Sequence, residues 1–213
     1  TLSAAAVNAM RRDVLNQLTA IRARHGNHPL GKPRKLKDYL GSAGMPGLSI
    51  QVTSREQITK KLLTMETAML YVPIHILLAD PVLTQVLVRR GNVAAVLPRI
   101  VHDEELTRLK LAFNDLRTMG VRDVLVGNLG LMIAARKAGF TIHGDFGLNI
   151  FNSRALHFCR ELELASACLS FEMTLPQIRD LSKAVPTELI VYGRLPLMVT
   201  EHCLIRNRTG QCT

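Results

Sequence analysis

The feature that most constrains this chain is a unit that recurs from residue 48 onward: a short β-branched run, a polar turn and an amphipathic helix. Consecutive parallel strands need crossover connections, and a helix after each strand supplies them. The alternation therefore predicts an α/β fold with one parallel sheet. We place its strands at residues 48–52, 69–73, 93–97, 123–126, 141–143, 167–170 and 189–192.

Local start and stop signals place the helices between these strands. Thr174 with Gln177 has the spacing of a capping box, in which each side chain serves an orphan backbone donor. Asp80 followed by Pro81 predicts a capped helix with proline at its first position. Three glycines stand where a left-handed C-terminal stop is expected: Gly91, Gly120 and Gly139.

Two architectures satisfy this alternation: a doubly wound open sheet and a (β/α) barrel. A dinucleotide-binding domain of the first kind carries a glycine-rich loop after its first strand. This chain has Val52-Thr53-Ser54-Arg55 at that place instead. The sequence thus favours a TIM-barrel-type fold with about seven strands, incomplete because a full barrel has eight.

The first 46 residues do not follow this repeat. Val7, Met10, Val14, Leu18 and Ile21 recur at three- and four-residue steps, which predicts one long amphipathic helix over about residues 3–24. Residues 25–46 are basic and rich in glycine and proline, which is typical of a linker. We therefore expect two domains: residues 1–46, an N-terminal helix with a basic linker, and residues 47–213, a barrel-like domain truncated at its C-terminal end.

The charge and the cysteine content of the chain indicate which partners and which cellular compartment are favoured. The formal net charge of the 213 residues is +10 at pH 7, and residues 1–47 account for +6 of it. Such an excess favours a polyanionic partner, RNA above all, although it serves solubility equally well. Four cysteines are too few for a disulfide scaffold in a chain of this length, which favours a reducing, cytoplasmic setting. The longest apolar run, residues 74–79, is far shorter than the roughly 20 residues of a membrane span, so no membrane partner is expected.

In either architecture the functional side chains gather where the strands end. Residues that follow the predicted strands include Arg99, Asp145, Asn149, Tyr192 and Arg194, which are our candidate substrate-binding residues. Asp145 and Asn149 belong to a polar loop that is longer than a helix cap requires. They could hold a substrate or orient another loop.

Glu172 stands just after the sixth predicted strand. A carboxylate there could perform acid–base chemistry, or it could form a structural ion pair with Arg99 or Arg194. Asn128, by contrast, directly precedes a helix and is better explained as a cap.

The four cysteines fall into two pairs. Cys159 lies on the apolar face of its helix and Cys168 lies within a strand, so both are expected in the core. Cys203 and Cys212 follow the last predicted strand in a polar loop, nine positions apart. Two thiols cannot complete a tetrahedral zinc site, and iron–sulfur clusters usually take four cysteine thiolates. The residues alone therefore leave open a partial metal site or two ordinary cysteines.

Three stretches resemble peptidase family U32, the collagenase-like protease family: GDFGLNIFNSRAL (144–156), LSFEMTLPQI (169–178) and VYGRLPLMVTEHC…GQC (191–212). They are most similar to the C-terminal unit of its long bacterial members, and NAMRRDVLNQL (8–18) resembles the segment that leads into that unit. The family name implies proteolysis of an unassigned catalytic type, for which Glu172, Glu201 and His202 are the candidate catalytic residues. His202 and Cys203 are adjacent in sequence, and such neighbours rarely form the nucleophile–base pair that activation requires.

Other members of this family are implicated in hydroxylation of tRNA or rRNA bases, or of the ubiquinone ring. They carry a four-iron–four-sulfur cluster on cysteines of the corresponding loop. By that resemblance, Cys203 and Cys212 match the first two thiols, and the remaining ligands are expected beyond Thr213 in a longer parent protein.

Three hypotheses follow. The first, which we prefer for the parent protein, is iron–sulfur-dependent hydroxylation of RNA bases or of a quinone. The second is a peptidase, and the third is a non-catalytic lobe that binds RNA or the remaining domains of the parent. We expect the chain alone to show little or no turnover.

Overall fold

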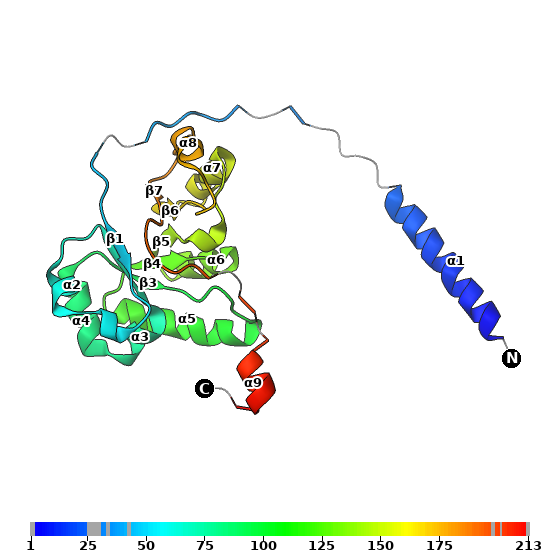
Figure 1. Ribbon diagram of the computed structural model, residues 1–213, viewed down its shortest axis with the longest axis horizontal. Helices are drawn as coiled ribbons and strands as arrows, with labels where there is room; N and C mark the ends of the chain where they lie inside the picture. The colour runs from blue at the N-terminus through cyan, green and yellow to red at the C-terminus, as the bar shows by residue number, and fades with distance from the viewer. Residues whose placement is uncertain are drawn as a thin grey trace. The chain divides into compact units, whose positions relative to one another are not determined.

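The structure is a computed structural model that describes residues 3–24, 31–32, 35–41, 44–196, 199–200 and 202–211. The chain divides into two units, Thr1–Lys35 and Leu36–Thr213. In the second unit seven parallel strands form one sheet, ordered as in the sequence, and this sheet curls into a half-barrel with helices between the strands (Figure 1). The prediction of an incomplete TIM-barrel-like α/β fold is confirmed.

The elements of the second unit keep the predicted alternation. Its strands are β1 (Ser49–Gln51), β2 (Met69–Pro73), β3 (Val93–Val96), β4 (Asp123–Val126), β5 (Thr141–Gly144), β6 (Ser166–Cys168) and β7 (Thr187–Glu188). The helices are α2 (Lys60–Thr64), α3 (Ile74–Ala79), α4 (Pro81–Arg90), α5 (Asp103–Thr118), α6 (Leu129–Lys137), α7 (Ser153–Glu161), α8 (Leu175–Arg179) and α9 (Leu204–Thr209), with 3-10 turns η1 (Arg55–Gln57) and η2 (Phe146–Leu148).

The expected caps are in place. Asp80 Oδ1 accepts the Leu83 N–H at 2.9 Å at the start of α4, and the capping box of Thr174 opens α8. Asn128 Oδ1 accepts the Gly130 N–H at 2.8 Å, so this residue caps α6 as predicted. The three stop glycines have positive φ angles of 83°, 93° and 80°, which side chains with a Cβ rarely adopt.

One face of the sheet packs against the helices. Strand residues such as Leu70, Val72 and Val124 form the main core with Phe113 and Leu116 of α5, and all five are at most 1% exposed. Phe113 and Leu116 are three positions apart in α5, so both lie on the face of this helix that packs on the sheet. Helices α3, α4, α6 and α7 contribute to the same core, which includes the buried Cys159.

The other face, which we call the lumen face, is partly polar. Side chains alternate between the two faces of a strand, and partners in a parallel ladder share a face. The register pairs Leu125 with His143, His143 with Ser166, and Cys168 with Glu188. Near the polar residues, Tyr71, Ala94 and Leu125 form a small separate apolar cluster.

The last strand was predicted wrongly. We placed it at residues 189–192, but β7 is Thr187–Glu188, and Val191 and Tyr192 are 83% and 97% exposed. The apolar run after Glu188 has high strand propensity, yet the ladder pairs Ala167 with Thr187 and Cys168 with Glu188. The half-buried carboxylate of Glu188 is tolerated in this strand because two side chains donate hydrogen bonds to it, which propensity alone cannot reveal.

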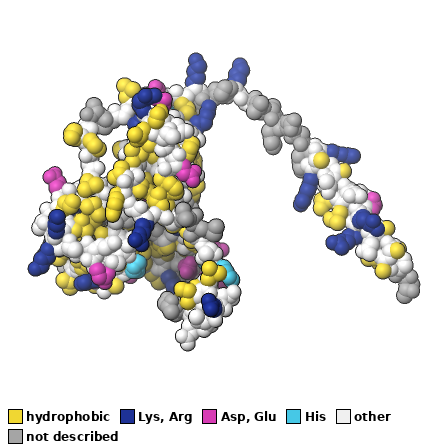
Figure 2. All heavy atoms as spheres, viewed as in Figure 1, with side chains coloured by type: hydrophobic (Ala, Val, Ile, Leu, Met, Phe, Trp, Pro, Cys, Tyr) yellow, Lys and Arg dark blue, Asp and Glu magenta, His cyan; other side chains and the backbone are white. Residues whose placement is uncertain are grey.

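The first unit contains helix α1 (Ala4–Ala23), which begins where predicted because Ser3 Oγ accepts the Ala6 N–H at 3.2 Å. None of its described residues is buried, and hydrophobic and basic side chains both lie along its surface (Figure 2). Among the described residues, no helix has the length and apolarity that a membrane span requires.

Part of the predicted linker belongs to the second unit. Tyr39 N–H donates to Ser182 Oγ at 2.9 Å, and Lys183 N–H donates to the Tyr39 carbonyl at 3.0 Å. The Tyr39 ring also packs against His157, with the ring centroids 5.3 Å apart. Other residues of that linker, 25–30, 33–34 and 42–43, lie outside the described residues.

Candidate active site

A connected set of hydrogen bonds crosses the lumen face. His143 Nε2 lies 3.2 Å from Asp123 Oδ1, and His143 Nδ1 lies 2.8 Å from Ser166 Oγ. Ser166 Oγ donates to Glu188 Oε1 at 2.9 Å, and the Tyr71 hydroxyl donates to the same oxygen at 2.6 Å. The set therefore joins β2, β4, β5, β6 and β7.

This network depends on the curl of the sheet. Four strands separate β2 from β7 in the sheet order. At the usual strand spacing, a flat sheet would place these two strands about 24 Å apart. The hydrogen bond from Tyr71 to Glu188 is possible only because the half-barrel brings the two strands face to face.

The direction of these bonds decides what Ser166 can do. A serine hydroxyl has one proton, and here that proton goes to Glu188. His143 Nδ1 must then donate to the Ser166 oxygen, so the ring cannot accept the serine proton in this arrangement. Although Asp123, His143 and Ser166 have the residue types of a hydrolase triad, the hydrogen-bond directions argue against an activated serine.

Asp145 follows β5 and is buried near this network. Its Oδ1 accepts the Phe146 N–H at 2.8 Å, which opens η2. Burial raises the pKa of the Asp145 carboxyl, and the negative charge of Glu188 adds to this, while the Phe146 N–H and Arg99 oppose it. Such a carboxyl is suited to donate a proton.

Cys168 is not a nucleophile. Burial and the nearby carboxylates of Asp145 and Glu188 raise the pKa of its thiol to about 12, so it stays a neutral thiol at physiological pH. Burial, followed by the hydrogen bond to Glu188, also raises the pKa of Tyr71, which keeps its hydroxyl proton. Cys168 and Tyr71 therefore both keep their protons at physiological pH.

The rim above Asp145 combines a cation with aromatic rings. Arg99 Cζ lies 5.0 Å from the centre of the Phe146 ring, and the Phe146 and Phe171 ring centroids are 6.0 Å apart. A Cβ on Gly147 would lie 2.9 Å from the Gly127 carbonyl oxygen and 3.1 Å from Arg99 Nε, so only glycine allows this close approach. An open groove of about 630 Å³ begins at Arg99 of this rim and is also lined by Gly127, Asn128 and Gly147 among others.

The structure brings some of the predicted binding residues together and separates others. Arg99 and Asp145 flank Gly127, where an added Cβ would lie 3.4 Å from Arg99 Cγ and 3.3 Å from Asp145 Oδ2. Asn149 follows η2 with a left-handed φ of 49° and is exposed.

The three other candidates at the predicted strand ends are exposed. Glu172 is held by its backbone N–H, which donates to Ser170 Oγ at 3.4 Å. Arg194 is exposed, and Tyr192 lies beyond the corrected end of β7.

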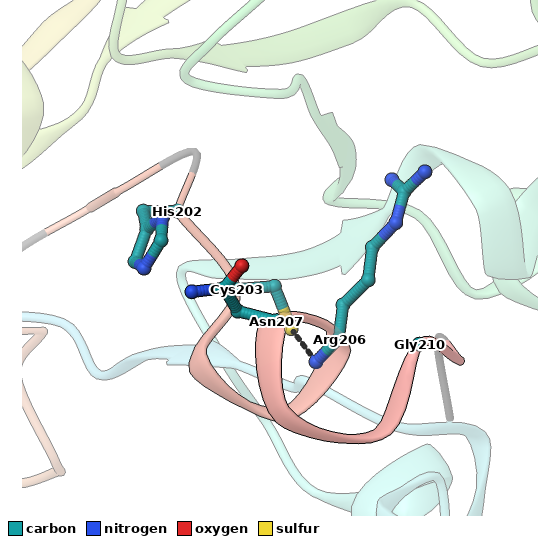
Figure 3. A pocket seen from close by; sticks show the side chains of 5 residues that line it. All are labelled: His202, Cys203, Arg206, Asn207 and Gly210. Atoms are coloured by element: carbon teal, nitrogen blue, oxygen red, sulfur yellow. Dashed lines mark hydrogen bonds between the residues drawn. The ribbon is translucent and has the colours of Figure 1, made fainter.

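The C-terminal candidates form a separate site. Cys203 caps α9, where its Sγ accepts the Arg206 N–H at 3.4 Å, and His202 extends away from this sulfur (Figure 3). These residues line a surface pocket of about 320 Å³ together with Asn207 and Gly210. Glu201 and Cys212 lie outside the described residues.

The thiols that the structure describes do not fit a complete iron–sulfur cluster. Cys203 is exposed, whereas Cys159 and Cys168 are buried. Within the described part of the chain, no group of three or more side chains could hold a metal ion. A four-thiolate cluster would therefore need ligands in addition to Cys203 and Cys212.

Reasoning from strand ends missed the lumen network because Tyr71 and His143 lie inside their strands and Asp123 and Ser166 begin theirs. Glu188 precedes the strand that we had placed at residues 189–192. A signal was present in the sequence: Thr141, His143 and Asp145 are polar at alternate positions, and so are Ser166, Cys168 and Ser170. In a sheet covered by helices on one face, polar residues with a period of two mark the other face.

We expect Asp145→Asn to increase the free energy of unfolding at neutral pH but not in acid. Because the folded-state pKa of Asp145 is raised, its contribution to stability is fully present below its ordinary value of 3.8 and is lost as the pH rises through the folded-state pKa. Asparagine keeps an oxygen for the Phe146 N–H and carries no charge. Urea unfolding across a pH series measures the difference.

The control is Asp180→Asn. Arg179 lowers the pKa of the exposed Asp180 carboxyl, so removing this charge should bring no gain at neutral pH. A stabilisation by Asp145→Asn that did not change with pH would contradict the burial of an ionisable carboxyl at this position.

A comparison with known protein families assigns most of this chain to one family. The family model described as Peptidase family U32 matches residues 84–212, more than half of the chain. This range contains the lumen residues on β4 to β7, the aromatic rim and Cys203. No curated protein and no solved structure matches the chain. The chain belongs to peptidase family U32, a collagenase-like protease family.

Proposed function

We propose that this chain is the substrate-binding lobe of an enzyme that hydroxylates a planar ring, an RNA base in preference to a quinone. The observation that carries the proposal is the rim of Arg99, Phe146 and Phe171, in which Phe171 is 45% exposed and Arg99 also lines the groove. An exposed aromatic side chain stacks on any nucleobase, and each such contact contributes about 1–3 kcal/mol. Arg99 is placed to meet a phosphate or a ring oxygen.

Charge favours RNA over a quinone as the substrate. The chain carries a net charge of +10, which attracts a polyanion in a manner that weakens with added salt. Below the rim, Asp145 would stay protonated more readily than an ordinary carboxyl and could donate a proton to a ring nitrogen or oxygen.

The iron–sulfur part of the proposal concerns a longer protein. There, Cys203 and Cys212 would be two ligands of a four-iron–four-sulfur cluster, and other domains would provide the rest. Such a cluster would supply electron transfer, while the residues of this chain bind the ring and exchange protons. We place this protein in the cytoplasm, where thiols stay reduced.

A peptidase is the second candidate, favoured by the family description and by the carboxylates in the lumen. Asp145 and Glu188 have different surroundings: Asp145 is buried, while Glu188 accepts two hydrogen bonds. Carboxyl groups with such different environments can divide the roles of acid and base in activating water. This mechanism requires neither a serine nor a cysteine nucleophile.

The binding step is tested with a single-stranded RNA oligonucleotide and the purified chain. Phe171→Ala should weaken binding by about 5- to 150-fold, the equivalent of about 1–3 kcal/mol of stacking. Leu175→Ala is the matched control, because Leu175 is a 76% exposed apolar residue on the neighbouring helix α8. Equal RNA affinities for the wild type and Phe171→Ala would contradict the proposal that the rim binds the RNA base.

The chemistry is tested in cells that lack the gene. Their RNA is digested to nucleosides and searched by mass spectrometry for nucleosides that regain one oxygen atom when the wild-type gene is restored, but not when Phe171→Ala is restored. The same proteins are assayed on gelatin. Restored hydroxylation supports the first candidate, gelatin cleavage supports the peptidase, and the absence of both overturns the proposed function.

A further inference from the structure

The lumen network links a solvent-accessible carboxylate to one at the C-terminal end of the sheet. The Asp123 side chain is 26% exposed, whereas that of His143 is 10% exposed and Ser166 is buried. Glu188 is the last residue of β7, so it lies at the end of the half-barrel where active sites of this fold are built. Four groups on four consecutive strands thus form an unbroken series of hydrogen bonds.

We propose that Asp123, His143, Ser166 and Glu188 form a proton relay, in which Glu188 exchanges the proton with the substrate and Asp123 exchanges it with water. The contacts are short enough for transfer along the whole series, at 3.2 Å, 2.8 Å and 2.9 Å. Ser166 and His143 each have one site that donates and one that accepts, which a relay requires at every interior position.

The protons balance in each direction. When Glu188 has taken a proton from the substrate, it passes that proton to the Ser166 oxygen, and the proton of Ser166 passes to His143 Nδ1. His143 then releases its Nε2 proton to Asp123, so that Nε2 accepts a hydrogen bond from the Asp123 carboxyl. This state has the directions that the structure shows at Ser166, which donates to Glu188 and accepts from His143 Nδ1. Asp123 exchanges its proton with water, and transfer in the opposite direction restores the Nε2–H form of His143.

Tyr71 is a positioning residue in this relay. Its hydroxyl donates to the same Glu188 oxygen that Ser166 occupies, Oε1, and burial helps it to keep its proton. Within the described residues, the second oxygen of Glu188 has no protein donor, so it is available to a substrate. The other ionisable groups near Glu188 are Asp145 and Cys168, which are both buried.

The relay can be tested without an assay of activity. Carboxyl ¹³C signals follow the titration of Glu188, and ring ¹⁵N signals follow His143, in the folded chain. We expect His143→Gln to shift the titration midpoint of Glu188, and Ser166→Ala to abolish this effect, since the hydroxyl that connects the two groups is gone. Ser166→Thr, which keeps the hydroxyl, should restore it.

Ser170→Ala is the matched control. Ser170 is a buried serine just beyond β6 whose Oγ accepts the Glu172 N–H, outside the relay. Coupling between His143 and Glu188 that persists in Ser166→Ala would overturn the relay. The wild type gives a second test if Ser166→Ala does not fold: a proton-free Nδ1 on His143, while Glu188 is ionised, would contradict the proposed directions.

That Glu188 acts on the substrate rests on the proposed function, whereas the relay itself does not. Coupling through Ser166 in a protein that neither hydroxylates RNA nor cleaves gelatin would leave the relay standing and overturn the function. Turnover that depends on Glu188 but not on Ser166 would support the proposed function and overturn the relay.

Discussion

In a longer protein that hydroxylates RNA, replacing Glu188 by glutamine is expected to lower the turnover number by about 100- to 10,000-fold, the usual contribution of a general acid or base. Glutamine matches glutamate in size, and its carbonyl oxygen can accept the hydrogen bonds from Tyr71 and Ser166. What it cannot do is accept a proton from the substrate. The loss should therefore appear in kcat, with little change in the affinity for single-stranded RNA.

Variants of two other glutamates show whether the loss of kcat is specific to Glu188. Glu163→Gln is the control, because the Glu163 side chain is 79% exposed and pairs with Arg136 on the surface at 3.8 Å. Glu172→Gln tests the prediction made from the strand ends. A large loss of kcat in Glu172→Gln, with Glu188→Gln near the wild type, would place the chemistry at the exposed rim rather than in the lumen.

The largest expected effect on stability comes from Phe113→Ala, which should reduce the free energy of unfolding by about 3–5 kcal/mol. Phe113 is 1% exposed, and its ring meets Phe140 edge to face at a centroid distance of 5.4 Å. Truncation removes this contact and leaves a cavity between α5 and the sheet. Urea unfolding measures the change.

Leu111→Ala on the same helix is the matched control, because Leu111 is 62% exposed. Leu111→Ala should change the free energy of unfolding by no more than about 0.5 kcal/mol, as most surface substitutions do. Similar losses in the two variants would mean that α5 does not bury the face assigned to it.

Most of the fold could be predicted from the sequence because local signals agreed with the global pattern. The caps at Asp80 and Asn128 and the buried Phe113 each follow from residues close together in the chain. The end of β7 could not be predicted in this way. Glu188 is a poor strand former, and its half-buried carboxylate accepts hydrogen bonds from Ser166 and from Tyr71, which is 117 positions away.

The same distinction applies to the site. The rule that function gathers at strand ends selects Arg99 and Asp145, which follow β3 and β5, and the structure places them on either side of Gly127. His143 and Ser166 reach Glu188 through neighbouring strands, whereas the curl of the sheet is what adds Tyr71 from β2. Sequence periodicity gives the face of a residue but not its partner across the lumen.

The central claim is that a flat ring binds on the aromatic rim above the lumen, and a titration of the ¹³C-labelled chain with a single-stranded RNA oligonucleotide tests it most directly. We predict that the ring signals of Phe146 and Phe171 shift and saturate together with the guanidinium signal of Arg99, while the ring signals of the buried Phe113 do not move. Shifts confined to the arginines of α1, with the signals of Phe146 and Phe171 unchanged at saturation, would contradict the claim.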